Sequence, residues 1–128
     1  MKKAQIPHDQ HRQGDVLCKI EKLPVGAKLV KSLDSRIAAR GEFSDHCHVI
    51  TGDCDIYEHD GRMYVKAGKK GVTLQHTKES MLPVNLENCS DLTVADHPKH
   101  ILKANEVYDV TIQNEFNPYD KLFQKVAD

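Results

Sequence analysis

Hydrophobic and polar residues alternate along much of this chain, in short runs that turn-forming residues separate. The clearest runs cover residues 15–20, 28–32, 36–43, 72–75, 92–95, 100–102 and 107–113. Alternation with a period of two is typical of half-buried β-strands. Many short strands separated by turns predict a mainly β protein, built as a small β-sandwich or barrel.

The two ends of the chain depart from this pattern. Residues 1–13 are polar and show no periodicity, which predicts a flexible N-terminal arm. Asn117 followed by Pro118 matches a helix N-cap with proline at the first helical position, and it predicts a C-terminal helix through about Ala127. We therefore expect a single β domain over residues 14–128 with a C-terminal helix.

Two dipeptides, Gly52-Asp53 and Asp60-Gly61, are favoured two-residue hairpin turns. Together they predict a three-stranded meander in which His46 faces His59 and Tyr57 faces Tyr64. Strand alternation then sorts the side chains onto a core face and a polar face. The core face carries Val49, Ile56, Met63 and Val65, and the polar face carries His46, His48, Tyr57, His59, Arg62, Tyr64 and Lys66.

Composition narrows the class of protein. The 128 residues are 39% apolar and 29% charged, which is ordinary for one globular domain. The formal net charge of -1 creates no strong field toward phosphates, so general nucleic-acid binding is not expected. No apolar stretch approaches the roughly 18 residues of a membrane span, so no membrane association is expected.

The four cysteines are too sparse for a disulfide scaffold, and no apolar signal segment follows the basic residues at positions 2 and 3. We therefore expect a reducing, cytoplasmic setting.

Histidine is the most suggestive residue type, with eight copies in the chain. His46 and His48 are two positions apart, so a strand places both imidazoles on one face. Neutral imidazole is a common ligand of zinc, iron and nickel, and a third ligand from His59 or His97 would complete an open site for such a divalent transition metal. The alternative is that His46 and His48 are exposed or hydrogen-bonded histidines on a polar sheet face.

The remaining candidates near this pair are predicted to have structural roles. Cys47 lies between the two histidines and should point to the opposite face, into the core. The other four histidines are isolated in the pattern and are predicted to lie on the surface or to serve in packing. These are His8, His11, His76 and His100.

Residues 41–61, with His46, His48 and a later glycine, are similar to the first motif of the cupins, small β-barrels that hold a catalytic metal. A cupin carries a glutamate shortly after the second histidine, where this chain has Thr-Gly-Asp at 51–53. The second cupin motif is absent, although His97 lies in the corresponding part of the chain. The resemblance implies a degenerate metal-binding barrel.

A second resemblance covers most of the chain except roughly residues 69–90, which resemble an insertion. It rests on the order of Arg-Gln-Gly-Asp-Val at 12–16, the His46 and His48 pair, Thr-Gly-Asp at 51–53, His97 and the run that begins at Val107. This order resembles that of a family of small uncharacterised proteins found in bacteria and their phages. The resemblance implies one compact domain, draws attention to His46, His48 and His97, and implies no activity.

Two functions from different classes follow from these patterns. The first is a metal-binding β domain with hydrolytic or oxidative chemistry, in which Asp45, Asp53 or Glu58 would act as general base.

The second is a non-catalytic accessory protein, of the kind that phages encode, that sequesters a small polar ligand or caps a protein partner. Tyr57, Arg62 and Tyr64 would offer it stacking surfaces and charged donors. Either protein could form a homo-oligomer through unpaired edge strands.

Overall fold

The computed structural model of the chain describes residues 9–41, 45–83, 85–87 and 98–112. The strand predicted at 92–95, the helix predicted at 117–127, His8 and His97 lie outside these residues.

The described residues form a single antiparallel sheet of eight strands, which confirms the prediction of a mainly β protein. The strands are β1 (Gln10–Gln13), β2 (Val16–Ile20), β3 (Lys28–Val30), β4 (Ile37–Arg40), β5 (His46–His59), β6 (Arg62–Lys78), β7 (His100–Leu102) and β8 (Val107–Ile112). Two short 3-10 helices, η1 (Leu33–Arg36) and η2 (Glu79–Met81), precede β4 and follow β6. Neither of these helices has the length or the apolar character needed to cross a membrane.

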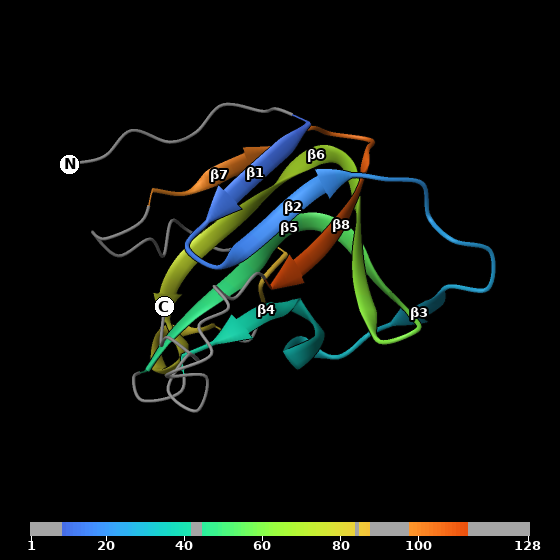
Figure 1. Ribbon diagram of the computed structural model, residues 1–128. Helices are drawn as coiled ribbons and strands as arrows, with labels where there is room; N and C mark the ends of the chain where they lie inside the picture. Colours follow the sequence, from blue (N-terminus) through green and yellow to red (C-terminus); the bar gives the residue numbers. More distant parts are fainter. Residues whose placement is uncertain (1–8, 42–44, 84, 88–97, 113–128) are drawn as a thin grey trace, which may run out of the picture.

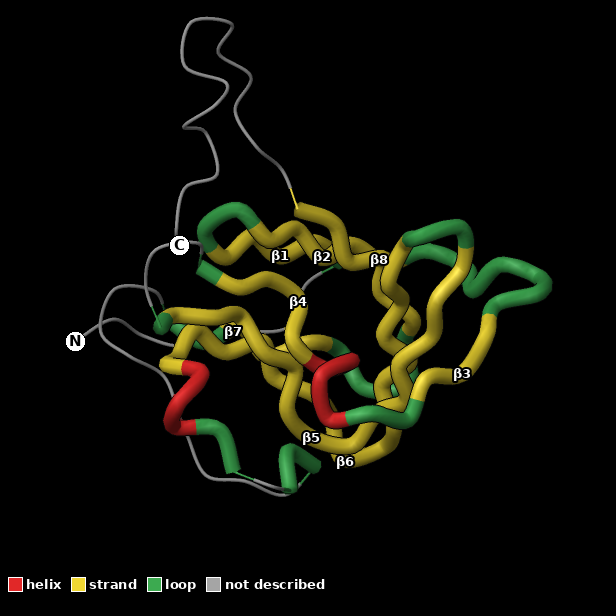
Figure 2. Tube along the Cα trace, turned by 90° about the horizontal axis from the view of Figure 1, so that it is seen from below, coloured by secondary structure: helices red, strands yellow, loops and turns green. Residues whose placement is uncertain are grey.

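The long hairpin of β5 and β6 organises the sheet (Figure 1). Near its turn, β6 pairs with β8 and β5 pairs with β3, whereas at its open end β6 pairs with β7 and β5 pairs with β4. The turn is Asp60-Gly61, as predicted, and both residues have the positive φ angles, 50° and 74°, that a type I′ turn requires. The paths of β5 and β6 curve strongly between the two halves in both the ribbon and the tube view (Figures 1 and 2).

The prediction of a second hairpin turn at Gly52-Asp53 is wrong. β5 runs through these residues, and its register with β6 shifts between Gly52 and Cys54 as at a β-bulge. Gly52 adopts φ 110°, and a Cβ atom on it would lie 2.7 Å from the carbonyl oxygen of Gly71. Glycine is therefore needed here because two backbones approach closely inside a strand pair. In the sequence, a glycine with this role cannot be told from a glycine in a turn.

Residues 10–13 are also structured differently from the prediction, because they form β1 instead of the end of a flexible arm. β1 pairs with β2 from Gln10↔Lys19 to Gln13↔Val16. Its buried positions are His11 and Gln13, which carry polar side chains. Buried and exposed positions therefore alternate in this strand as in any half-buried strand. The buried side chains are polar, so the alternation does not appear in the hydrophobic pattern of the sequence.

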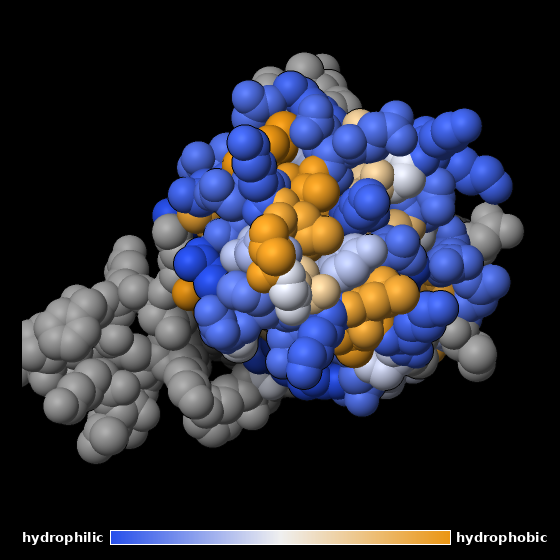
Figure 3. All heavy atoms as spheres, turned by 90° about the vertical axis from the view of Figure 1, so that its right-hand side faces the viewer, coloured by the Kyte–Doolittle hydropathy of each residue, from blue (hydrophilic) through white to orange (hydrophobic). Residues whose placement is uncertain are grey.

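The core draws on β2, β5, β6, β7 and β8. Its fully buried members include Val16, Cys18, Ile50, Val65, Leu74, Leu102 and Tyr108. The surface on the side of β3 is mostly hydrophilic with interspersed apolar side chains (Figure 3), and the exposed large apolar residues include Val25 and Leu29.

Candidate functional site

Three histidines meet at the open end of the β5–β6 hairpin. His46 and His48 share one face of β5, and the register pairs His48 directly with His76 on β6. The ring centroid of His76 lies 5.0 Å from that of His46 and 4.8 Å from that of His48. We call these three residues the histidine cluster. The sequence pattern did not connect His76 with this pair, because the predicted turn at Gly52-Asp53 hid the register in which β6 runs far enough to bring His76 opposite His48.

The cluster extends from the interior to the surface. His76 has no exposed surface, His48 is 3% exposed, and His46 is half-buried. Imidazoles in such a position are expected to be satisfied by hydrogen bonds, ring contacts or a bound cation.

Gln13 determines the tautomer of His48. Its Nε2 donates to the carbonyl oxygens of Leu74 at 3.1 Å and Pro98 at 2.8 Å. Because Nε2 is the only donor of this carboxamide, these two acceptors fix its orientation. The Oε1 atom then faces His48 Nδ1 at 2.9 Å. Since Oε1 can only accept, Nδ1 of His48 carries the hydrogen, and the lone pair of the neutral ring is on Nε2.

A second pair of buried histidines lies close to Gln13 in the fold. His11 is two residues before Gln13 on β1, and its Nδ1 is 3.0 Å from Nδ1 of His100 on β7. Their rings are edge to face, with centroids 5.2 Å apart. One Nδ1 must donate and the other accept. The sequence pattern did not bring His11 and His100 together, whereas the fold places β1 beside β7 without pairing the two strands.

His59, a predicted third ligand, lies at the opposite end of β5 from His46. It pairs with Arg62 beside the Asp60-Gly61 turn, and His46 pairs with Lys78. The predicted pairing of His46 with His59 is wrong because it required the turn at Gly52-Asp53. The structure thus brings His46 and His48 together and adds His76, whereas His59 stands apart and His97 lies outside the described residues.

The rings of the cluster touch but do not converge on one point. The planes of His46 and His76 meet at 87°, and those of His48 and His76 at 44°. Across the described residues, no three His, Cys, Asp or Glu side chains are arranged to hold a metal ion as they stand.

Cys47 confirms the predicted alternation. It pairs with Thr77, faces away from the histidines and is buried. Burial, followed by the nearby Glu79 carboxylate, raises the pKa of its thiol to about 11. The thiol is therefore protonated at neutral pH and has the core role that the sequence predicts.

The carboxylates considered as general bases make other contacts. The side chain of Asp45 accepts hydrogen bonds from the backbone N–H and the hydroxyl of Ser80. Asp53 accepts from the backbone N–H of Lys70 at 3.3 Å. Glu58 is exposed near the hairpin turn.

The predicted ligand-binding trio lies near the turn of the hairpin. Tyr57 pairs with Tyr64 as predicted, but Tyr64 is buried, and the guanidinium of Arg62 donates to Asp109 at 2.6 Å. Tyr57 and Arg62 border a hollow of about 320 Å³. Their exposed parts thus face a shallow concavity.

Comparisons of the chain with protein-family models, with curated proteins and with solved structures find no match in any of the three. The function is therefore argued from the histidine cluster and the cavities of this chain.

Proposed function

We propose that this protein is a metal-binding β domain that holds a divalent transition metal at the histidine cluster. The observation that carries the proposal is the hydrogen bond from His48 Nδ1 to Gln13 Oε1. A histidine that ligates a metal through one nitrogen usually donates its other ring N–H to an oxygen acceptor, which fixes the tautomer. Gln13 provides this arrangement for His48 and leaves Nε2 as the ligating atom.

The spacing of the three rings supports the same proposal. Two imidazoles on one tetrahedral zinc, each with its nitrogen about 2.1 Å from the ion, have centroids roughly 5 Å apart. The measured separations of 5.0 Å and 4.8 Å match this value. Because the terminal torsion of histidine has a broad energy minimum, rotation of the His46 and His76 rings could aim their nitrogens at a common ion.

The donor set indicates which cations to expect. Neutral imidazoles suit zinc, iron and nickel, whereas magnesium and calcium require oxygen ligands. His46 is half-buried, so the cluster is connected to solvent on one side. A bound cation would there polarise a water molecule or a substrate oxygen, which is the chemistry of hydrolytic and oxidative metal sites.

We further propose that the bent sheet closes as a small barrel, the architecture that the partial resemblance to cupins implies. The contact between His11 on β1 and His100 on β7 supports closure, because it joins two strands that have no ladder between them.

The test is elemental analysis of the full chain purified without an affinity tag or chelator, followed by titration with cobalt, whose absorption reports imidazole coordination. We expect stoichiometric metal in the parent protein and its loss in His48→Ala and His76→Ala. Gln13→Leu removes the hydrogen-bond acceptor and should weaken cobalt binding by about 10- to 100-fold. His59→Ala is the matched control and should bind as the parent does.

Two results would overturn the proposal. One is a parent protein that contains no metal and binds no added zinc, nickel, iron or cobalt. The other is binding that His59→Ala weakens as much as His76→Ala, since His59 stands apart from the cluster. Circular dichroism of each variant shows whether lost binding reflects lost folding.

A further inference from the structure

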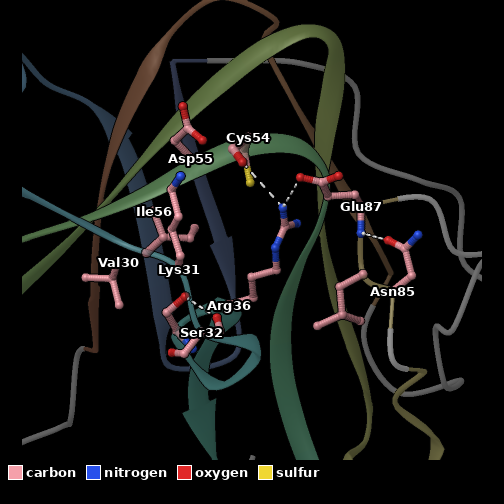
Figure 4. A pocket seen from close by; sticks show the side chains of 11 residues that line it. Val30, Lys31, Ser32, Arg36, Cys54, Asp55, Ile56, Asn85 and Glu87 are labelled. Carbon is pink, nitrogen blue, oxygen red and sulfur yellow. Dashed lines mark hydrogen bonds and ion pairs between the residues drawn. The ribbon is translucent and has the colours of Figure 1, made fainter.

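A cavity of about 460 Å³ opens on the side of the sheet that carries β3, distinct from the histidine cluster. Its walls come from the segment that joins β3 to η1, from β5 just after the bulge, and from residues 85–87 (Figure 4). Sites for small molecules in proteins have volumes of roughly 300–1,000 Å³. The cavity therefore has room for a small ligand.

The cavity contains a buried positive charge. Arg36 ends η1, whose first turn is capped by the Ser32 hydroxyl accepting from the backbone N–H of Ser35. The side chain of Arg36 is only 11% exposed. Its Nη1 donates to the carbonyl oxygens of Ile50 at 3.3 Å and Gly52 at 3.0 Å.

A third hydrogen bond runs from Nη2 of Arg36 to the carbonyl oxygen of Cys54 at 3.3 Å. These three bonds hold the guanidinium against the bulge of β5. All three acceptors are neutral, so they orient the charge and do not cancel it. A guanidinium has five N–H donors, and three are used in this way.

The negative charge opposite Arg36 comes from Glu87, at 3.6 Å, which is too long for a hydrogen bond. The side chain of Glu87 is 69% exposed, so its carboxylate is well hydrated, whereas the guanidinium of Arg36 is not. Burial raises the pKa of the neighbouring Cys54 thiol to about 11, so this thiol is neutral at pH 7 and adds no negative charge. A buried cation with such a distant counter-charge is incompletely compensated.

We propose that this cavity binds a small organic monocarboxylate, whose carboxylate pairs with Arg36 in place of Glu87. Figure 4 shows the guanidinium of Arg36 pointing toward Glu87, with Lys31 and Asp55 on another part of the rim. Arg36 and Lys31 carry two positive charges, and Glu87 and Asp55 carry two negative charges. When the carboxylate of a ligand replaces that of Glu87 beside Arg36, the charges within the cavity stay balanced.

The remaining walls specify the rest of the ligand. Val30, Ile56 and Leu86 line the cavity with hydrocarbon, which favours a short aliphatic chain. A dianion such as phosphate would add excess negative charge beside Asp55 and Glu87. An aliphatic monocarboxylate matches both the charged and the apolar parts of the cavity.

The test is titration of the folded, isotope-labelled chain with sodium hexanoate, followed by amide chemical shifts in NMR spectra. We expect saturable shifts confined to residues 30–36, 54–56 and 85–87. Glu87→Gln removes the competing carboxylate and should tighten binding by up to about fivefold, the worth of an exposed ion pair. Glu21→Gln, an exposed residue outside the cavity wall, is the charge-matched control and should leave the affinity unchanged.

Arg36 also supports the fold, so Arg36→Ala alone would be ambiguous. Arg36→Lys keeps the charge but loses the planar pair of donors, and it should weaken hexanoate binding at least tenfold in protein that remains folded. The proposal is overturned if neither the parent nor Glu87→Gln binds hexanoate saturably, if 1-hexanol binds equally well, or if phosphate binds there instead. Because the cavity is separate from the histidine cluster, none of these outcomes depends on metal binding.

Discussion

The guanidinium of Arg62 donates from Nη2 to Oδ2 of Asp109 at 2.6 Å, and the two side chains differ greatly in exposure. The side chain of Arg62 is half-exposed, whereas that of Asp109 is 3% exposed. The ion pair connects β6 to β8, with Arg62 two residues before Tyr64, the residue that pairs with Asp109. A residue that the sequence suggested as a ligand contact thus also compensates a buried carboxylate.

Arg62→Ala should lower the free energy of unfolding by about 2 kcal/mol, because it leaves the Asp109 carboxylate buried without its cation. Urea unfolding measures this loss. Asp109→Asn in the same chain should restore part of it, giving a favourable coupling in a double-mutant cycle. Arg12→Ala, which removes an exposed contact to the carbonyl of Gly14, is the control. Equal losses in Arg62→Ala and Arg12→Ala would show that the buried pair contributes little.

Gly52→Ala should be strongly destabilising, by about 3 kcal/mol, since φ 110° is unfavourable for alanine and its Cβ would approach the Gly71 carbonyl. Gly61→Ala is the matched comparison, because Gly61 also has positive φ but has open space around it. Its cost should be about 1 kcal/mol, from backbone strain alone. Thermal unfolding of both variants gives the comparison, and similar midpoints would contradict the close approach at the bulge.

The buried thiols should make stability fall at alkaline pH. Burial, and then the Asp109 carboxylate, raise the pKa of Cys18 from 9.0 to about 12. Below pH 9 both the folded and the unfolded chain keep this proton, so the full stability is present. As the pH rises from 9 toward 12, the unfolded chain loses the proton and the folded chain retains it, so stability decreases.

Urea unfolding at a series of pH values measures this decrease, and Cys18→Ala should show a smaller one than the parent. Cys18, Cys47 and Cys54 are buried, so in the folded protein at neutral pH they should also resist thiol reagents until a denaturant is added. Rapid modification of all three in the folded state would contradict the burial that underlies this prediction.

The contact between His11 and His100 should contribute to stability. Its 3.0 Å separation requires one Nδ1 that donates and one that accepts. His100→Leu removes this hydrogen bond and should lower the free energy of unfolding by about 1 kcal/mol, which urea unfolding measures. His100→Asn keeps a polar side chain at this position and should lose less. An equal loss in both variants would show that the pair does not join β1 to β7.

The parts of the fold that the sequence predicted correctly depend only on residues that are close together in the sequence. The Asp60-Gly61 turn and its pairs Tyr57↔Tyr64 and His59↔Arg62 follow from two residues with positive φ. Gly52-Asp53 gave the same local signal, yet the close approach to Gly71 that explains this glycine involves a residue distant in sequence. The sequence pattern therefore shows that a glycine is needed at position 52, but it does not show which contact requires it.

The sequence predicted only part of the histidine cluster, because only that part depends on residues close together in the chain. His46 and His48 belong together because a strand alternates, and this is a local property. His76 joins them only through the register beyond the bulge, and Gln13 only through the approach of β1. The two-residue spacing of His11 and Gln13 was the one signal in the sequence for the contribution of β1. Polar residues at alternate positions fit a strand whose buried side chains are hydrogen-bonded.

The histidine cluster lies at the end of the hairpin that we expect to open most readily. His46 and His48 lie in the rungs of β5 and β6 farthest from the Asp60-Gly61 turn, beyond the bulge at Gly52. Strand ends open by local fluctuations that leave the rest of a sheet paired. Transient separation of the last rungs would divide the cluster between two strands while the core stays folded. For the cation that we propose at this site, exchange with solvent would then follow the fraying rate of this end, which the contacts of Gln13 and β4 with β5 would slow.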